Sequence, residues 1–247
     1  MDSSGRSSLR EELAPFAAIL QADVSSLFRS KLTYGWLIAA LFLEVIRVLS
    51  SVSGGTVSQV VGTGLSDFIL IWSVIIIGLT ASSVSSETGE FADSVMSKSV
   101  TRFDYLFAKF CSRTLYVLTM FGAISFVSVG LSLELLKSDY QTYGLIYSIL
   151  LVALSLVMLS TLGVAISTVA PNTVIAIIGL LVIWYFMALF FPLARLGFLS
   201  PSELASGLPS NIRGIWSVEE WKTVVGYVAM SIGAFSLSTL YFYVKDI

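Results

Sequence analysis

The sequence predicts an all-α integral membrane protein with six transmembrane helices, and three observations support this fold class. Hydrophobic residues make up 56% of the 247-residue chain, and charged residues make up only 12%, against roughly 25% in a soluble domain. The mean hydropathy is +0.89. Six apolar stretches each reach or approach the ~20 residues with which a helix crosses the hydrocarbon core: residues 34–52, 67–83, 106–131, 143–168, 173–193 and 223–244. We therefore expect a single transmembrane domain over residues 1–247.

An amphipathic helix is predicted before the first span, over residues 8–32. Its apolar residues recur at spacings of three and four and therefore share one face of a helix: Leu9, Leu13, Phe16, Leu20, Val24 and Leu27. A helix of this kind lies in the membrane interface rather than across the bilayer. We call it the elbow helix. The same pattern also fits a helix packed in the cytoplasm.

The first span carries two charges, Glu44 and Arg47, three residues apart on one helix face. Counted from Thr33, Glu44 lies about 16 Å into the span at 1.5 Å per residue. An ionised group at that depth costs at least about 2.5 kcal/mol, so we expect partners or water beside it. The pair either lines a translocation path for a polar substrate or forms a structural ion pair between helices. In the second case Arg47 reaches toward the outer surface.

Residues 194–222, between the last two spans, are predicted to form short outer helices. Ser200, Pro201 and Glu203 have the order of an N-cap, a first-turn proline and a capping-box acid. Trp216 and Trp221 suit the aromatic belt at a membrane surface. With the N-terminus in the cytoplasm, the inner segments taken together hold more Lys and Arg than the outer segments. Both termini are therefore expected in the cytoplasm of a multi-pass protein of the cell membrane.

The segment of residues 86–104, between the second and third spans, is the most polar part of the chain's middle. Phe91, Val95, Met96 and Val100 alternate with polar residues at helical spacing, which predicts a short amphipathic helix parallel to the membrane. An ordinary solvated loop is the alternative. On the predicted topology, the segment faces the cytoplasm.

This segment resembles the cytoplasmic loop of type-2 ABC transporter permeases. Glu87 and Gly89 open it, "SVMSKSVTR" follows, and "FDYLFAKF" completes it, with Arg102 seven residues before Lys109 as in that family. Ser99 stands where the family usually has proline, and Ala108 where it usually has glycine. The order of elbow helix, six spans and helical outer segment also resembles these permeases over the whole chain.

The resemblance implies that residues 86–104 contain a coupling helix, which seats in a groove of a separate ATPase subunit. Two ATPase subunits, with ATP and magnesium, and a second permease copy or homologue would complete the transporter. Phe91, Val95 and Met96 would pack against the spans, and Glu87 could pair with Arg29 or Lys31 of the elbow helix. The implied coupling residues are Glu87, Gly89, Asp93, Ser94, Ser97, Lys98, Thr101, Arg102 and Lys109.

Composition excludes several other functions. The chain has no histidine and one cysteine, Cys111, which removes histidine-dependent hydrolases, haem ligation by histidine and cysteine-rich metal sites. No stretch fits the phosphate-binding loop G-x-x-x-x-G-K-[ST], so no cofactor is expected on this chain. A net charge of −2 argues against nucleic acid as a partner. The polar, acidic N-terminus lacks the order of a cleaved signal peptide.

We therefore expect a membrane subunit of an ATP-driven exporter, not itself an enzyme, surrounded by lipid and working beside separate ATPase chains. A secondary transporter or channel that needs no ATP is the alternative. A membrane scaffold without transport activity is a third interpretation.

Overall fold

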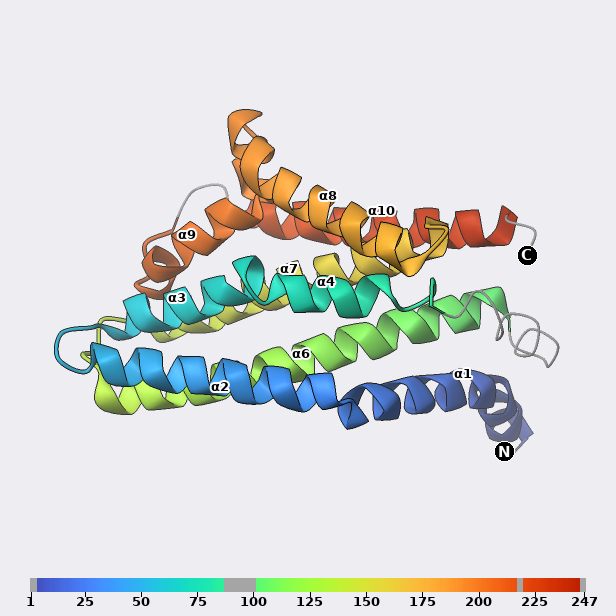
Figure 1. Cartoon of the computed structure of the whole chain (residues 1–247), viewed down its shortest axis with the longest axis horizontal. Helices are drawn as coiled ribbons and strands as arrows, with labels where there is room; N and C mark the ends of the chain where they lie inside the picture. The colour runs from blue at the N-terminus through green and yellow to red at the C-terminus, as the bar shows by residue number, and fades with distance from the viewer. Residues whose placement is uncertain (1–3, 87–100, 217–219, 245–247) are drawn as a thin grey trace.

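The computed structural model describes residues 4–86, 101–216 and 220–244 (Figure 1). It describes side chains from residue 15 onward, except that of residue 243. These residues form helices and contain no β-strand. In chain order the helices are α1 (Ser4–Arg29), α2 (Lys31–Ser51), α3 (Val57–Leu70), α4 (Ser73–Ala81), α6 (Arg102–Leu135), α7 (Thr142–Val169), α8 (Thr173–Leu193), η1 (Gly197–Leu199), α9 (Pro201–Ile212) and α10 (Glu220–Val244).

Six stretches of the described chain are long and apolar enough to cross a membrane: α2, α3 with α4, α6, α7, α8 and most of α10. The number of spans agrees with the sequence prediction, but the bounds of the second and third spans differ. The second span runs over Val57–Ala81 rather than residues 67–83. The third is a helix of 34 residues, about 51 Å long at 1.5 Å per residue, and extends beyond the ~30 Å of a hydrocarbon core.

The second span is interrupted between α3 and α4, at Ile71 and Trp72. Two side chains of α8 satisfy backbone carbonyls beside this break. Trp184 Nε1 donates to Ile69 O at 3.1 Å, and the Tyr185 hydroxyl donates to Leu70 O at 2.7 Å. Because lipid offers no hydrogen bonds to freed carbonyls, these two residues allow the helix to change direction inside the bundle.

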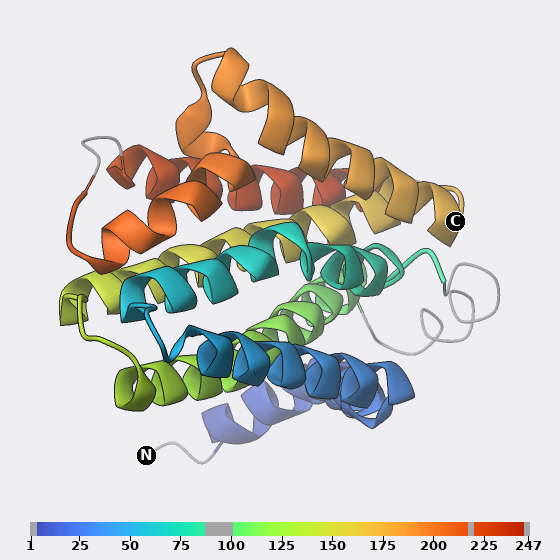
Figure 2. The same cartoon turned by 60° about the vertical axis from the view of Figure 1, so that its left-hand side comes forward.

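The helices form three layers, which Figures 1 and 2 show from two directions. One layer holds α1, α2 and α6, the middle layer holds α3, α4 and α7, and the third holds α8, α9 and α10. Contacts of α6 with α7, and of α7 with α10, join the layers. Both α4 and α10 end, and α6 begins, at one end of the bundle; α9 lies at the opposite end (Figure 1).

The core is densely apolar, and so is much of the outer surface. Trp184, Tyr116 and Phe68 are among the large side chains that are fully buried, whereas Phe126 and Leu237 are 81% and 69% exposed. Large exposed apolar side chains of this kind occur along α2, α6, α8 and α10. Such a surface is unfavourable in water and favourable in lipid, so the chain is a multi-pass membrane protein.

Two connections organise the end of the bundle that carries α9. Asp139, in the loop between α6 and α7, caps α3: the Ser58 N–H and hydroxyl donate to its carboxylate at 2.8 and 2.5 Å. Gly144 of α7 lies against α9 so closely that a Cβ there would be 2.3 Å from Asn211 O. These contacts hold the short helices of this end on the long ones.

Helices occur in the two regions where an elbow helix and short outer helices were predicted, but their bounds and caps differ from the prediction. Residues 8–32 were expected as one helix, but α1 ends at Arg29 and Ser30 caps α2. The helix α9 begins at Pro201 as expected, although the Ser200 hydroxyl does not cap it and instead donates to Ala188 O of α8. The positions of α1 and α9 relative to a membrane surface stay predictions.

Candidate functional site

The candidate site is the pair of anchors on either side of residues 87–100. On the entry side, the Ser167 hydroxyl of α7 accepts hydrogen bonds from the backbone N–H groups of Val84 and Ser85, both at 2.9 Å. The Ser85 hydroxyl also donates to Thr173 Oγ1 of α8 at 3.2 Å. Val84 and Ser85, which precede the polar segment, are therefore attached to the end of α7 and the start of α8.

On the exit side, Thr101 and Arg102 start the long helix α6. Thr101 is its N-cap: its hydroxyl accepts from the N–H of Asp104 at 3.1 Å, and it donates to the Asp104 carboxylate at 2.6 Å. Arg102 Nη1 donates to Phe242 O, near the end of α10, at 3.1 Å. Both predicted coupling residues thus hold the start of α6 in place within the chain.

Six other predicted coupling residues lie outside the described residues: Glu87, Gly89, Asp93, Ser94, Ser97 and Lys98. The proposed pairing of Glu87 with Arg29 or Lys31 also lies outside them, as do Phe91, Val95 and Met96.

Lys109, the last predicted coupling residue, is buried between α6 and α1. Its side chain is 4% exposed, and Nζ lies 3.0 Å from Asp23 Oδ1. The other oxygen of Asp23 accepts from the Ser112 hydroxyl at 2.5 Å, and Arg113 Nη2 lies 3.7 Å from Oδ1. A carboxylate of α1 thus joins two cations of α6.

Sequence reasoning treated Asp23 as a polar position of the elbow helix and did not assign it a partner. A signal was present, because Asp23 falls between Leu20, Val24 and Leu27 and therefore lies on the apolar face of the helix. A carboxylate on a buried face needs a cationic or hydrogen-bonding partner. Lys109 and Arg113, four residues apart on one face of α6, meet that need.

An aromatic cluster extends the same contact to α10. Phe107 of α6 stacks on Phe16 of α1 with ring centroids 5.6 Å apart, and on Phe103 at 5.7 Å. Phe110 of α6 lies 5.5 Å from Phe235 of α10. The first turns of α6 are therefore packed against α1 on one side and α10 on the other.

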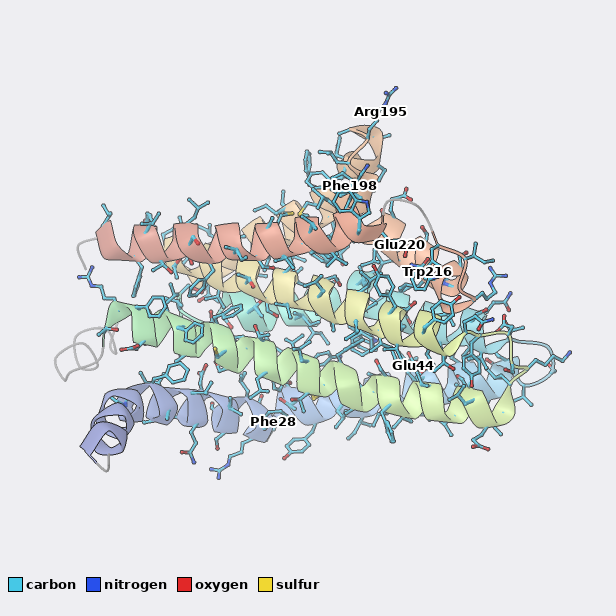
Figure 3. All side chains as sticks on the ribbon, turned by 180° about the vertical axis from the view of Figure 1, so that it is seen from behind. Phe28, Glu44, Arg195, Phe198, Trp216 and Glu220 are labelled. Carbon is cyan, nitrogen blue, oxygen red and sulfur yellow. The ribbon has the colours of Figure 1, made fainter. Side chains whose placement is uncertain are left out.

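The charges within the first span are also paired. Arg47 donates to Glu44 Oε1 at 2.6 Å and forms an ion pair with Asp67 of α3. Ser128 of α6 donates to Glu44 Oε2 at 2.9 Å. Glu44 is 1% exposed and lies within the bundle (Figure 3). We call these four residues the intramembrane ion network.

The network joins α2, α3 and α6, as a structural ion pair would; whether Glu44 and Arg47 also line a translocation path stays a prediction. A Cβ at Gly64 would lie 2.7 Å from Glu44 Oε2, so glycine there allows α3 to approach the carboxylate. Asp67, Ser128 and Gly64 were not predicted. Asp67 was placed at the edge of its span, whereas in the structure it is ten residues into the span, which begins at Val57.

Neither candidate site has the donors of a metal centre. Among the described residues, no group of three or more Cys, Asp and Glu side chains could hold a metal ion.

Comparison with protein-family models finds none that matches the chain. A search of curated proteins likewise finds no significant match. The functional assignment therefore depends on the residues and on their arrangement in the fold.

Proposed function

We propose that the chain is the membrane-spanning permease subunit of an ATP-driven exporter of the type-2 ABC kind. One observation carries the proposal. Residues 87–100 join two anchors, Ser167 before them and Thr101 with Arg102 after them, and each anchor is bonded to helices that run through the bundle. A force applied to this segment would therefore enter the spans directly.

The proposed mechanism transmits motion and contains no chemical step on this chain. A separate ATPase subunit binds ATP and magnesium and moves the segment of residues 87–100. Arg102 passes that displacement to α10, and Asp23 with the aromatic cluster passes it to α1. Because packed helices shift as units rather than deform continuously, the three layers would rearrange together and expose the substrate path to the other side.

The proposal places the chain in the cell membrane with both termini in the cytoplasm. On this topology α1 lies in the inner interface and α9 lies on the outer side. Two ATPase subunits and a second permease copy or homologue complete the assembly. Cysteine labelling of residues 93–102 in sealed cells tests the orientation, because reaction with an impermeant reagent from outside would contradict it.

Co-purification tests the partner. The tagged chain is extracted from its native membrane, and its bound subunits are identified and assayed for ATP hydrolysis. We expect an ATPase subunit in the complex, and we expect Asp93→Arg or Lys98→Glu to weaken its binding. A complex that contains no nucleotide-hydrolysing subunit would remove the proposal.

Coupling is tested within the described part of the chain by Arg102→Ala. This variant loses the bond to Phe242 O, so we expect the ATPase subunit to remain bound while its activity no longer depends on the permease. Arg195→Ala, at an exposed position between α8 and η1, is the matched control and should behave as wild type. Unchanged coupling in Arg102→Ala would remove this contact from the transmission path.

The intramembrane ion network is the observation that favours a second candidate, a transporter driven by an ion gradient. Ionisable residues within a bilayer often mark ion pathways, and Glu44, Arg47 and Asp67 all lie inside spans. Substrate movement in vesicles that hold an ion gradient but no ATP would support this second function over the first.

A further inference from the structure

A pocket opens at the end of the bundle that carries α9, opposite the end at which α6 begins (Figure 1). Its volume is about 500 Å³, and α7, η1, α9 and α10 line it. This volume falls within the range of roughly 300–1,000 Å³ that is typical of small-molecule sites. Figure 3 shows three of the lining residues, Phe198, Glu220 and Trp216, close together around the start of α10.

The helix α9 supplies a polar wall of the pocket. Glu203, Ser206 and Ser210 line it, and their spacings of three and four residues place them on one face of the helix. Thr223 of α10 adds a further hydroxyl to this wall. Within the described part of the chain, the side-chain oxygens of Glu203, Ser210 and Thr223 make no hydrogen bond. These groups are therefore available to a ligand.

Two aromatic side chains, Phe198 and Trp216, form an aromatic wall of the same pocket. Trp216 is held by α7: its ring lies 4.7 Å edge-on from that of Tyr147 and stacks on Tyr143 at 5.9 Å. Phe198 belongs to η1, which contacts both α9 and α10. Both aromatic rings are therefore backed by neighbouring elements, so the wall is in place before a ligand binds.

Gly207, in the interior of α9, also lines the pocket. Glycine inside a helix is unfavourable relative to alanine. A Cβ at this position would meet no atom within 4 Å, so packing within the chain does not require glycine there. Its absence of a side chain leaves the backbone of α9 open toward the pocket, which suits a ligand that lies against the helix.

We propose that this pocket binds a neutral glycosyl group, that is, a sugar ring that carries an apolar substituent. Each sugar hydroxyl can both donate and accept a hydrogen bond, so it can pair with the hydroxyls and the carboxylate of the polar wall. The apolar C–H face of the ring packs on Phe198 or Trp216. Leu151 and Leu204, which also line the pocket, accommodate the apolar substituent.

Other ligand classes use fewer of these features. An aromatic compound with a single hydroxyl would desolvate the polar wall and leave most of its groups unpaired, which is costly. A phosphate or carboxylate ligand is normally held by arginine or lysine, and the described lining contains neither. A solvated helix face would explain the hydroxyls of α9 but not the aromatic wall opposite them.

Binding is tested on the purified full-length chain in lipid nanodiscs by saturation-transfer NMR, with the signal from empty nanodiscs subtracted. The first probe is phenyl β-D-glucopyranoside. The second is 2-phenoxytetrahydropyran, which keeps the ring and the phenyl group but has no hydroxyl, and the third is the cation phenyltrimethylammonium. We expect saturable binding of the glucoside, with the other two probes bound at least about tenfold more weakly because they cannot pair with the polar wall.

Two variants remove one hydroxyl each from the polar wall. Ser210→Ala and Thr223→Val should weaken binding of the glucoside by about three- to tenfold, the value of one hydrogen bond. Ser236→Ala, at an exposed position of α10 outside the pocket, is the matched control and should bind as wild type.

A third variant fills the pocket from the backbone of α9. Gly207→Leu introduces a good helix former, so we expect the melting temperature to be kept and the saturable binding to be lost. Gly122→Leu is the matched control, because Gly122 is an exposed residue inside α6 at which a Cβ also meets no atom within 4 Å.

Nanodiscs that contain a glucosyl diacylglycerol show whether the glycosyl group belongs to a lipid. Weaker binding of the glucoside in these nanodiscs identifies a lipid headgroup as the ligand, and unchanged binding identifies a soluble glycoside; both agree with the proposal. Equal binding of the glucoside and 2-phenoxytetrahydropyran, tighter binding of phenyltrimethylammonium, or wild-type binding in Ser210→Ala, Thr223→Val and Gly207→Leu would overturn it. The assay contains no ATPase subunit, so its outcome is independent of the proposed transport function.

Discussion

Arg47 of α2 and Asp67 of α3 form an ion pair between two membrane-spanning helices. Arg47 is shared with Glu44 of its own helix, and Ser128 of α6 binds the second oxygen of Glu44. A guanidinium can serve both carboxylates because it carries five N–H donors in a fixed planar arrangement. This single cation therefore links the helices on which the first half of the bundle is built.

Arg47→Gln should be the most destabilising change in the intramembrane ion network, because it leaves two carboxylates without their cation. We expect a loss of about 3 kcal/mol or more in the free energy of unfolding, measured by denaturation in mixed detergent micelles. Arg195→Gln, at an exposed position, is the control. An Arg47→Gln chain that assembles with wild-type stability but fails in transport would instead make the network part of the substrate path.

Asp23→Asn should loosen α1 from α6. The carboxylate lies between Lys109 and Arg113, whose side chains are 4% and 10% exposed, and removal of a buried partner charge typically costs about 3 kcal/mol. We expect faster hydrogen exchange in α1 and a lower melting temperature. Asp104→Asn, which alters only the α6 cap, should leave exchange in α1 unchanged. Equal protection of α1 in both variants would contradict a structural role for Asp23.

Gly144→Ala and Gly122→Ala should have opposite effects. A Cβ at Gly144 would lie 2.3 Å from Asn211 O and 2.8 Å from Ile212 O, both backbone atoms, whereas one at Gly122 meets nothing within 4 Å. We expect Gly144→Ala to lower the melting temperature by separating α7 from α9. Gly122→Ala, in the interior of α6, should raise stability by about 0.5–1 kcal/mol through helix propensity. A neutral Gly144→Ala would show that α9 can move at little cost.

Asp139 should make stability depend on pH. Burial alone would raise the pKa of its carboxyl, but hydrogen bonds from Ser58 and Thr56 and the charge of Arg213 outweigh burial and lower it. A folded-state pKa below the unfolded value means that the stabilisation is present above the unfolded value, about 3.9. The stabilisation is lost as pH falls through the folded-state pKa.

At neutral pH, Asp139→Ala should cost about 1 kcal/mol, as for loss of other helix caps. The difference between wild type and Asp139→Ala should shrink as pH is lowered from 7 toward 3 in thermal melts. Glu134→Ala, nearby at the end of α6, provides the control for acid effects in general. A difference that stayed constant across this range would mean that the cap does not depend on the charge of Asp139.

Much of the architecture could be predicted because the bilayer imposes it locally. A helix that crosses ~30 Å of hydrocarbon must contain about 20 mostly apolar residues, and the stretches around α7 and α8 show this without reference to any neighbour. The sequence prediction began the second span ten residues too late, because Ser58 and Asp67 make the first half of this span look too polar. Each has a partner distant in sequence, Asp139 and Arg47, which neutralises that polarity only after folding.

The candidate sites, too, could be predicted only in part from the sequence. Composition and spacing alone determined that the chain lies in a membrane, that Glu44 and Arg47 share a helix face, and that a polar segment interrupts the spans. The packing of the helices decided that Lys109 is buried on Asp23, that Arg102 holds α10, and that Glu203 and Glu220 share a pocket with Trp216. The physical reason is range: hydrophobicity and helix periodicity act over a few neighbouring residues, whereas charge pairing and cavities depend on which distant helices come together.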